Sequence, residues 1–209
     1  MRLVLVDINV ERGPSEGCRA IQASLEQLEP DVRVLHTHWR DFKGVEGDGL
    51  ILGPNGTPFP AYPPAFVSFL SMLPQYTGPV LGICGGHQAL GLAHGATVAP
   101  VYDQPAASTS YAGMQKVEGL VTLKVLDKVH PLFRGFQETL TLNASHVDEL
   151  KTLPRGFTCL ATNARSHIQI MAHTTHHQVG VQCHPERLHG APQGADLLRA
   201  WIRIARALI

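Results

Sequence analysis

The chain has 209 residues, enough for one domain with a sizeable buried core, and its 44% hydrophobic and 16% charged residues are typical of a globular protein. Its 17 Lys and Arg residues balance 17 Asp and Glu residues, which excludes the basic field of a typical nucleic-acid or acidic-membrane binder. No apolar run approaches the ~20 residues of a membrane span, and Asp7 interrupts the apolar start too early for a signal peptide.

The first half of the chain alternates predicted strands with predicted helices. Short apolar runs predict buried strands at residues 3–6, 32–35, 49–52 and 79–83. Apolar residues at helical spacing predict helices at residues 16–28, 65–73 and 87–94. This alternation predicts a parallel sheet wrapped by helices, with right-handed crossovers.

After Gly95 the pattern changes to short β-rich segments separated by turns. We expect antiparallel strands at residues 120–126, 139–143, 157–162 and 167–172, then a strand at 179–183 and a closing helix at 191–208. Residues 100–113, rich in Ala, Ser and Pro, are expected to form a loop. Residues 1–209 are therefore predicted to form a single α/β domain, with an open, mostly parallel sheet flanked by helices and extended by antiparallel strands.

One cysteine stands at the junction of a predicted strand and a glycine turn. In PVLGICGGHQAL (residues 79–90), Cys84 ends the strand, and Gly85 and Gly86 allow a tight turn into the next helix. A sulfur at that point lies beside backbone N–H groups that can stabilise an oxyanion. This is the geometry of a nucleophile elbow, with cysteine in place of serine. Taken alone, Cys84 would more simply be a small buried hydrophobe.

A second motif supplies a base for this cysteine. VQCHPE (residues 181–186) ends a predicted strand with His184 two positions before Glu186, and Pro185 fixes the backbone between them. Residues two apart in an extended chain point the same way. Glu186 can therefore hold one ring nitrogen of His184 while the other faces a thiol. Together with Cys84, this predicts a nucleophile, a base and an orienting carboxylate.

At these motifs the sequence resembles a known family. GICGGHQ (residues 82–88) resembles the G-x-C-x-G-x-Q nucleophile motif of class I (triad) glutamine amidotransferases, and QCHPE (182–186) is similar to their Q-F-H-P-E motif. SHVDEL (145–150), followed by LPRGF (153–157), resembles a run found in GMP synthase glutaminase domains and their relatives. ILGPNG (51–56) occupies the place of the family's glycine-rich loop. The matches fall in order and span nearly the whole chain.

The resemblance implies a flavodoxin-like fold and a role for each motif residue. Cys84 resembles the nucleophile, His184 the general base and acid, and Glu186 its orienting carboxylate. The backbone N–H groups of Gly53 and Gly85 would form the oxyanion hole. The implied reaction makes a γ-glutamyl thioester on the cysteine, releases ammonia, and ends when water releases glutamate. It needs no metal and no cofactor.

The resemblance also implies contacts to the substrate glutamine. The amino-acid end of glutamine would be held by Gln88, Ser145, His146 and Val147. Gln88 follows the nucleophile by one helical turn, which favours a side chain facing the site over an ordinary surface position. His146 is expected to lie in the core or beside the pocket and not to act in catalysis.

The destination of the ammonia is not visible in the motifs. The chain has no GxxxxGK[ST] motif for ATP and no recognisable synthase domain. The family therefore implies a separate synthase or acceptor protein, with a leaning towards GMP synthase, and no nucleic-acid or membrane partner. Two alternatives stay open: a stand-alone hydrolase of another γ-glutamyl compound, or a non-catalytic regulatory protein on the same fold.

Three further features allow two interpretations each. Cys183 stands where the family has phenylalanine, and it is either a redox partner or, more simply, a core residue. HTTHHQ (residues 173–178) suggests a metal site or, more simply, a solvated hairpin turn, because no carboxylate or cysteine stands at ligand spacing. Asp7 and Asn9 follow a strand and could serve the site or a structural turn. The four cysteines form no CxxC pair and indicate reduced thiols in a cytoplasmic protein.

Overall fold

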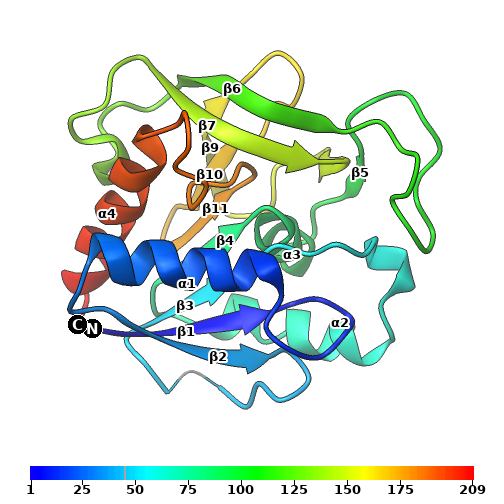
Figure 1. The fold of residues 1–209 in the computed structure, drawn as a ribbon, viewed down its shortest axis with the longest axis horizontal. Coiled ribbons are helices and arrows are strands. Elements are labelled where there is room, and N and C mark those ends of the chain that lie inside the picture. The colour runs from blue at the N-terminus through cyan, green and yellow to red at the C-terminus, as the bar shows by residue number, and fades with distance from the viewer. Residues whose placement is uncertain (45) are drawn as a thin grey trace.

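The apolar runs of the first half form the parallel strands of one large sheet (Figure 1). The computed structural model describes residues 1–44 and 46–209. The sheet begins in the order β2–β1–β3–β4–β11, with every neighbouring pair parallel. These strands are β1 (Arg2–Asp7), β2 (Arg33–His38), β3 (Gly49–Leu52), β4 (Val80–Ile83) and β11 (Gln178–Val181). Both β3 and β4 are buried along their whole length, which explains their continuous apolar sequences.

The second half of the chain extends the same sheet with antiparallel strands. The order continues β11–β10–β9–β6–β7, and β6 and β7 form a long hairpin (Figure 1). These strands are β6 (Val117–Val125), β7 (Thr139–His146), β9 (Phe157–Thr162) and β10 (Ile170–His173). A separate two-stranded sheet, absent from the sequence prediction, pairs β5 (Val98–Pro100) with β8 (Asp148–Leu150). The predicted fold class is confirmed.

Helices cover both faces of the sheet. The α-helices are α1 (Glu16–Leu28), α2 (Ala65–Leu70), α3 (Gly85–Ala93) and α4 (Gln193–Arg206). In β1, Leu3 packs with Ile21 of α1 and Trp201 of α4, whereas the next residue, Val4, packs with Phe66 of α2 on the opposite face. The alternating side-chain directions of a strand thus feed two hydrophobic cores.

Three short 3₁₀ helices complete the regular structure: η1 (Phe59–Ala61), η2 (Leu73–Gln75) and η3 (Pro131–Phe133). The helix predicted at 65–73 ends at Leu70, and η2 follows it. Residues 101–116, all of them described, contain no helix or strand, so the predicted loop is confirmed. None of the helices within the described ranges is long and apolar enough to cross a membrane.

Candidate active site

Cys84 lies in the tight turn between β4 and α3. Its backbone has φ 51° and ψ −105°, and it is the one residue other than glycine with positive φ among those the structure describes. Such a conformation costs on the order of 1–3 kcal/mol and persists only where the surroundings enforce it. Here the Cys84 N–H donates to Val181 O at 2.8 Å, and the Gln88 N–H donates to Cys84 O at 3.1 Å. A Cβ on Gly86 would overlap the Leu52 carbonyl, so glycine is required for α3 to pack this close to β3.

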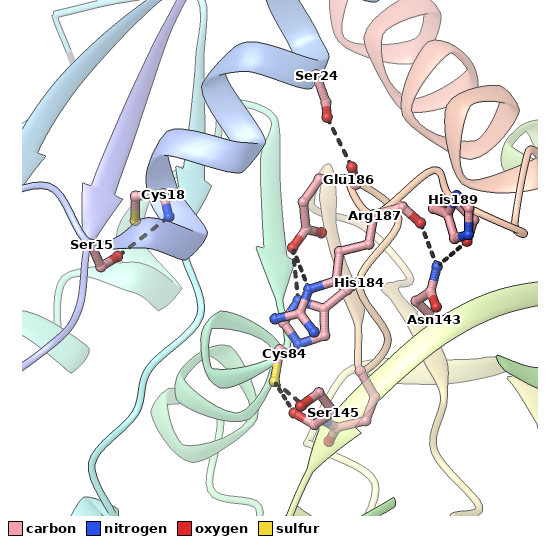
Figure 2. A network of polar contacts seen from close by, with 11 residues as sticks. Ser15, Cys18, Ser24, Cys84, Asn143, Ser145, His184, Glu186, Arg187 and His189 are labelled. Atoms are coloured by element: carbon pink, nitrogen blue, oxygen red, sulfur yellow. Dashed lines mark hydrogen bonds and ion pairs between the residues drawn. The ribbon is translucent and has the colours of Figure 1, made fainter. Parts of the chain in front are cut away.

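His184 lies beside the Cys84 sulfur, with Glu186 on its other side (Figure 2). Its Nδ1 donates to Glu186 Oε1 at 2.7 Å, and both side chains are buried. Burial alone would lower the pKa of His184, but the adjacent Cys84 sulfur and the Glu186 carboxylate raise it above its usual value. The backbone on either side is fixed, since His184 N donates to Asn143 O at 2.7 Å and Ser24 Oγ donates to Glu186 O at 2.8 Å. The predicted nucleophile, base and orienting carboxylate are therefore brought together.

The structure corrects one of the two predicted oxyanion donors. The Gly53 N–H donates to Val6 O at 3.0 Å, because the chain continues the β1–β3 pairing for one more residue. It is therefore not free to bind an oxyanion. The peptide nitrogen of Asn55 instead lies 2.7 Å from the position that a Cβ on Gly85 would take. Within the described ranges, neither the Gly85 nor the Asn55 N–H has a hydrogen-bond acceptor.

The loop that carries Asn55 is held by Asp7 and Asn9. Asp7 Oδ1 accepts from the Asn9 backbone N–H at 3.0 Å and from its side-chain Nδ2 at 2.7 Å. Asn9 in turn donates to Pro54 O at 3.1 Å and accepts from the Gly56 N–H at 2.9 Å. Although burial acts in the opposite direction, hydrogen bonds from Asn9 and Ser15 lower the pKa of Asp7. Of the two interpretations of Asp7 and Asn9, the structure favours the structural one.

A cavity of about 200 Å³ opens onto Cys84. All four predicted substrate-binding residues line it: Gln88, Ser145, His146 and Val147. The Ser145 carbonyl lies 3.9 Å from the Cys84 sulfur, as Figure 2 shows. Whether these four residues contact glutamine stays a prediction.

Two of these side chains support the cavity wall. Gln88 Nε2 donates to Asp148 O at 2.7 Å and to Gln182 Oε1 at 3.1 Å. His146 Nδ1 lies 2.9 Å from the same Asp148 carbonyl. Burial lowers the pKa of His146 to about 4, so its ring is neutral at pH 7 and donates from Nδ1. The wall at residues 146–148 is thus anchored from two directions, and His146 makes no side-chain bond to the nucleophile.

Sequence reasoning missed four residues of the cavity: Asn55, Tyr111, Lys116 and Asp148. Tyr111 belongs to the loop at 101–116, and its hydroxyl donates to Asp148 Oδ2 at 2.7 Å. The SHVDEL motif already contained Asp148, so its match to the family could have indicated it. Nothing in the pattern around Tyr111 could have done so, because that contact joins residues 37 positions apart.

The remaining sequence features lie outside the cavity. Cys183 is fully buried, its thiol donates to Gln169 Oε1 at 3.2 Å, and burial raises its pKa far above the usual value, as expected of a core residue. The turn expected at 174–177 joins β10 to β11, but it is less solvated than predicted, because His173 stacks on His176 with ring centroids 4.4 Å apart. No group of three metal-ligating side chains occurs in residues 1–44 and 46–209. All four cysteines are free thiols.

Comparisons with known proteins agree with this geometry. The family model "Glutamine amidotransferase class-I" matches residues 17–204. The separate glutamine-hydrolyzing subunit of the GMP synthase of Methanosarcina barkeri is 32% identical over 189 residues, which is 90% of each chain. The glutamine-hydrolyzing GMP synthase of Thermomicrobium roseum is 33% identical over 166 residues, covering 79% of this chain and 28% of that protein.

Solved structures confirm the fold. The crystal structure of a glutamine amidotransferase from Thermotoga maritima superposes with a TM-score of 0.69 at 18% identity and covers 97% of both chains. The ordered motifs, the site geometry and the family match over residues 17–204 lead to one assignment. The chain belongs to the class-I glutamine amidotransferase family.

Proposed function

We propose that this protein hydrolyses the side-chain amide of glutamine and supplies the ammonia to a separate synthase subunit. The observation that carries the proposal is the arrangement at Cys84. Its sulfur stands in a strained turn beside His184, whose other ring nitrogen is bonded to Glu186 at 2.7 Å. The relatives named as glutamine-hydrolyzing GMP synthase subunits support both the substrate and the class of partner.

The first half of the reaction breaks the carbon–nitrogen bond. The Cys84 sulfur attacks the amide carbon of glutamine, and negative charge develops on the amide oxygen. The free N–H groups of Gly85 and Asn55, which lie close together, are the donors we assign to that oxyanion. The C–N bond then breaks, and the departing nitrogen takes a proton from His184 Nε2. The products are ammonia and a γ-glutamyl thioester on Cys84.

The second half returns the enzyme to its starting state. A water molecule gives a proton to His184 and attacks the thioester carbon. The C–S bond breaks, glutamate leaves, and the thiolate of Cys84 is restored beside the imidazolium. The raised pKa of His184 favours this charged pair, and Glu186 stabilises the imidazolium through Nδ1.

The ammonia acceptor is proposed from the relatives alone. In Thermomicrobium roseum the similar region is 28% of a longer GMP synthase, whereas in Methanosarcina barkeri it matches 90% of a separate glutamine-hydrolyzing subunit. The present chain resembles the second organisation, so we propose a GMP-synthase-like partner protein. We place this activity in the cytoplasm, where four free thiols stay reduced.

The test compares the cysteine of the site with another cysteine. Glutamine-dependent ammonia release is measured for the parent, for Cys84→Ala and for the control Cys159→Ala, which removes a half-buried thiol on β9. Alkylation by a glutamine-like diazoketone is followed in parallel, because it needs only the nucleophile and no partner protein. We expect Cys84→Ala to abolish both signals and Cys159→Ala to keep both.

Other outcomes would select the alternatives. Turnover of other γ-glutamyl amides without turnover of glutamine would indicate a different hydrolase with the same three residues. A Cys84 thiol that the diazoketone modifies no faster than a free thiol would contradict any catalytic role and favour a regulatory protein.

A further inference from the structure

The loop at residues 101–116 reaches into the active-site cavity through one side chain. Tyr111 lines the cavity together with Cys84, and its hydroxyl donates to Asp148 Oδ2 at 2.7 Å. The reaction proposed above uses neither Tyr111 nor Asp148. The contact spans 37 positions of sequence and joins the loop to the strand β8.

Asp148 carries a carboxylate oxygen that lacks a partner. The residue is 6% exposed, and its Oδ1 is buried without a hydrogen bond to any group in the described ranges. Burial raises the pKa of Asp148, while the Tyr111 hydroxyl and Lys151 act in the opposite direction. A buried carboxylate oxygen left unpaired is costly. Oδ1 is therefore suited to a cationic or N–H donor that arrives with a ligand.

The surroundings of Asp148 hold its backbone still. Its carbonyl accepts from Gln88 Nε2 at 2.7 Å and lies 2.9 Å from His146 Nδ1. The side chain is then oriented by Tyr111 from outside, so both ends of the residue are fixed. The cavity of about 200 Å³ contains this carboxylate and the nucleophile together. A compact molecule with an amide at one end and an ammonium group at the other matches both features.

We propose that Tyr111 is a positioning residue that holds the Asp148 carboxylate to receive the α-ammonium group of the substrate. The inference rests on the proposed glutaminase function and deepens it, because it assigns the group that distinguishes an α-amino acid from other carboxamides. The loop at 101–116 thereby contributes to substrate selection through a single hydroxyl.

The experiment compares two substrates in matched variants. Glutamine is compared with 4-carbamoylbutanoate, which has the same amide chain and carboxylate but no amino group. Tyr111→Phe removes only the hydroxyl. Tyr102→Phe is the control, because it makes the same change in the same loop at a hydroxyl that has no side-chain hydrogen bond in the described part of the chain.

We expect Tyr111→Phe to lower kcat/KM for glutamine about tenfold, as loss of a hydrogen bond to a charged group implies, mainly through KM. The value for 4-carbamoylbutanoate should stay within twofold, and Tyr102→Phe should change neither substrate. Asp148→Asn, with Tyr111 intact, should remove most of the preference for glutamine. Affinities of both ligands for Cys84→Ala protein, measured by calorimetry with and without Tyr111→Phe, give the same comparison without turnover.

Several results would overturn the inference. An equal loss for both substrates would show that the tyrosine only stabilises the loop. An unchanged preference in either the Tyr111 or the Asp148 variant would show that the carboxylate does not recognise the ammonium group. A parent protein that neither binds nor hydrolyses glutamine would instead refute the proposed function, and this inference with it.

Discussion

Acid should destabilise this protein through two buried histidines. His87 is fully buried in α3, and His146 is 5% exposed beside the active site. Burial lowers the pKa of His87 to about 3 and that of His146 to about 4, against an ordinary value of 6.5. The unfolded chain therefore binds protons below pH 6.5 that the native state refuses. Stability is lost as the pH falls from 6.5 towards these lowered values.

The magnitude follows from the two shifts. Between pH 7 and pH 4.5 each histidine should cost about 2–3 kcal/mol, and the pair about 5 kcal/mol. That is a large part of the ~5–15 kcal/mol that stabilises a typical domain. His184 adds nothing in this interval, because its raised pKa leaves it protonated in both states below pH 6.5. Four less buried histidines have lowered pKa values and act in the same direction as the pair: His36, His94, His130 and His173.

The assay is urea unfolding at pH 7 and pH 4.5, followed by the fluorescence of the buried Trp39 and Trp201. His87→Met replaces the ring with a flexible apolar side chain of similar volume and should remove about half of the loss assigned to the pair. His177→Gln, at an exposed position of the 174–177 turn, should leave the loss unchanged. A parent protein that loses less than ~1 kcal/mol, or a His87→Met variant with the full loss, would refute the reasoning.

Three other substitutions test separate parts of the structure. Glu186→Gln should lower kcat/KM for glutamine about 10²–10⁴-fold with little change in thermal stability, because His184 loses the carboxylate that orients it; retained activity would contradict this. Gly86→Ala should cost about 1–3 kcal/mol in urea unfolding, since its Cβ would overlap the Leu52 carbonyl; unchanged stability would contradict the close packing of α3. Arg206→Ala, at a half-exposed side chain that pairs with Glu29 at 2.9 Å and Asp31 at 2.6 Å, should cost ~1 kcal/mol or less and less still in high salt.

The fold was predictable where local signals are strong. Strand β3 at 49–52 and helix α1 at 16–28 occur at the predicted residues. Buried parallel strands have continuous apolar sequences, and Ser15 caps α1 by accepting from the Cys18 N–H. The pair β5–β8 was not predictable in this way, because strands of three residues show no periodicity and β8 is fully buried despite its charged sequence.

The site was predictable only where its residues lie in contiguous motifs. Cys84, His184 and Glu186 each follow a strand in a recognisable pattern, and the structure brings them together. The Gly53 prediction was wrong because the direction of a peptide N–H depends on its partner in the neighbouring strand, here Val6.

The residues that sequence reasoning missed depend on contacts across the fold. Tyr111 enters the cavity from a loop without periodicity, so only the three-dimensional structure relates it to Asp148. The free N–H of Asn55 is likewise recognisable only once Gly85 is seen beside it.

The central claim is that Cys84 forms a γ-glutamyl thioester. The most direct measurement is mass spectrometry of protein mixed with glutamine and quenched in acid, followed by peptide mapping. We predict a γ-glutamyl adduct on the peptide that contains Cys84, absent from Cys84→Ala and unchanged in Cys159→Ala. Ammonia release from glutamine with the adduct on another residue, or release that persists in Cys84→Ala, would contradict the account.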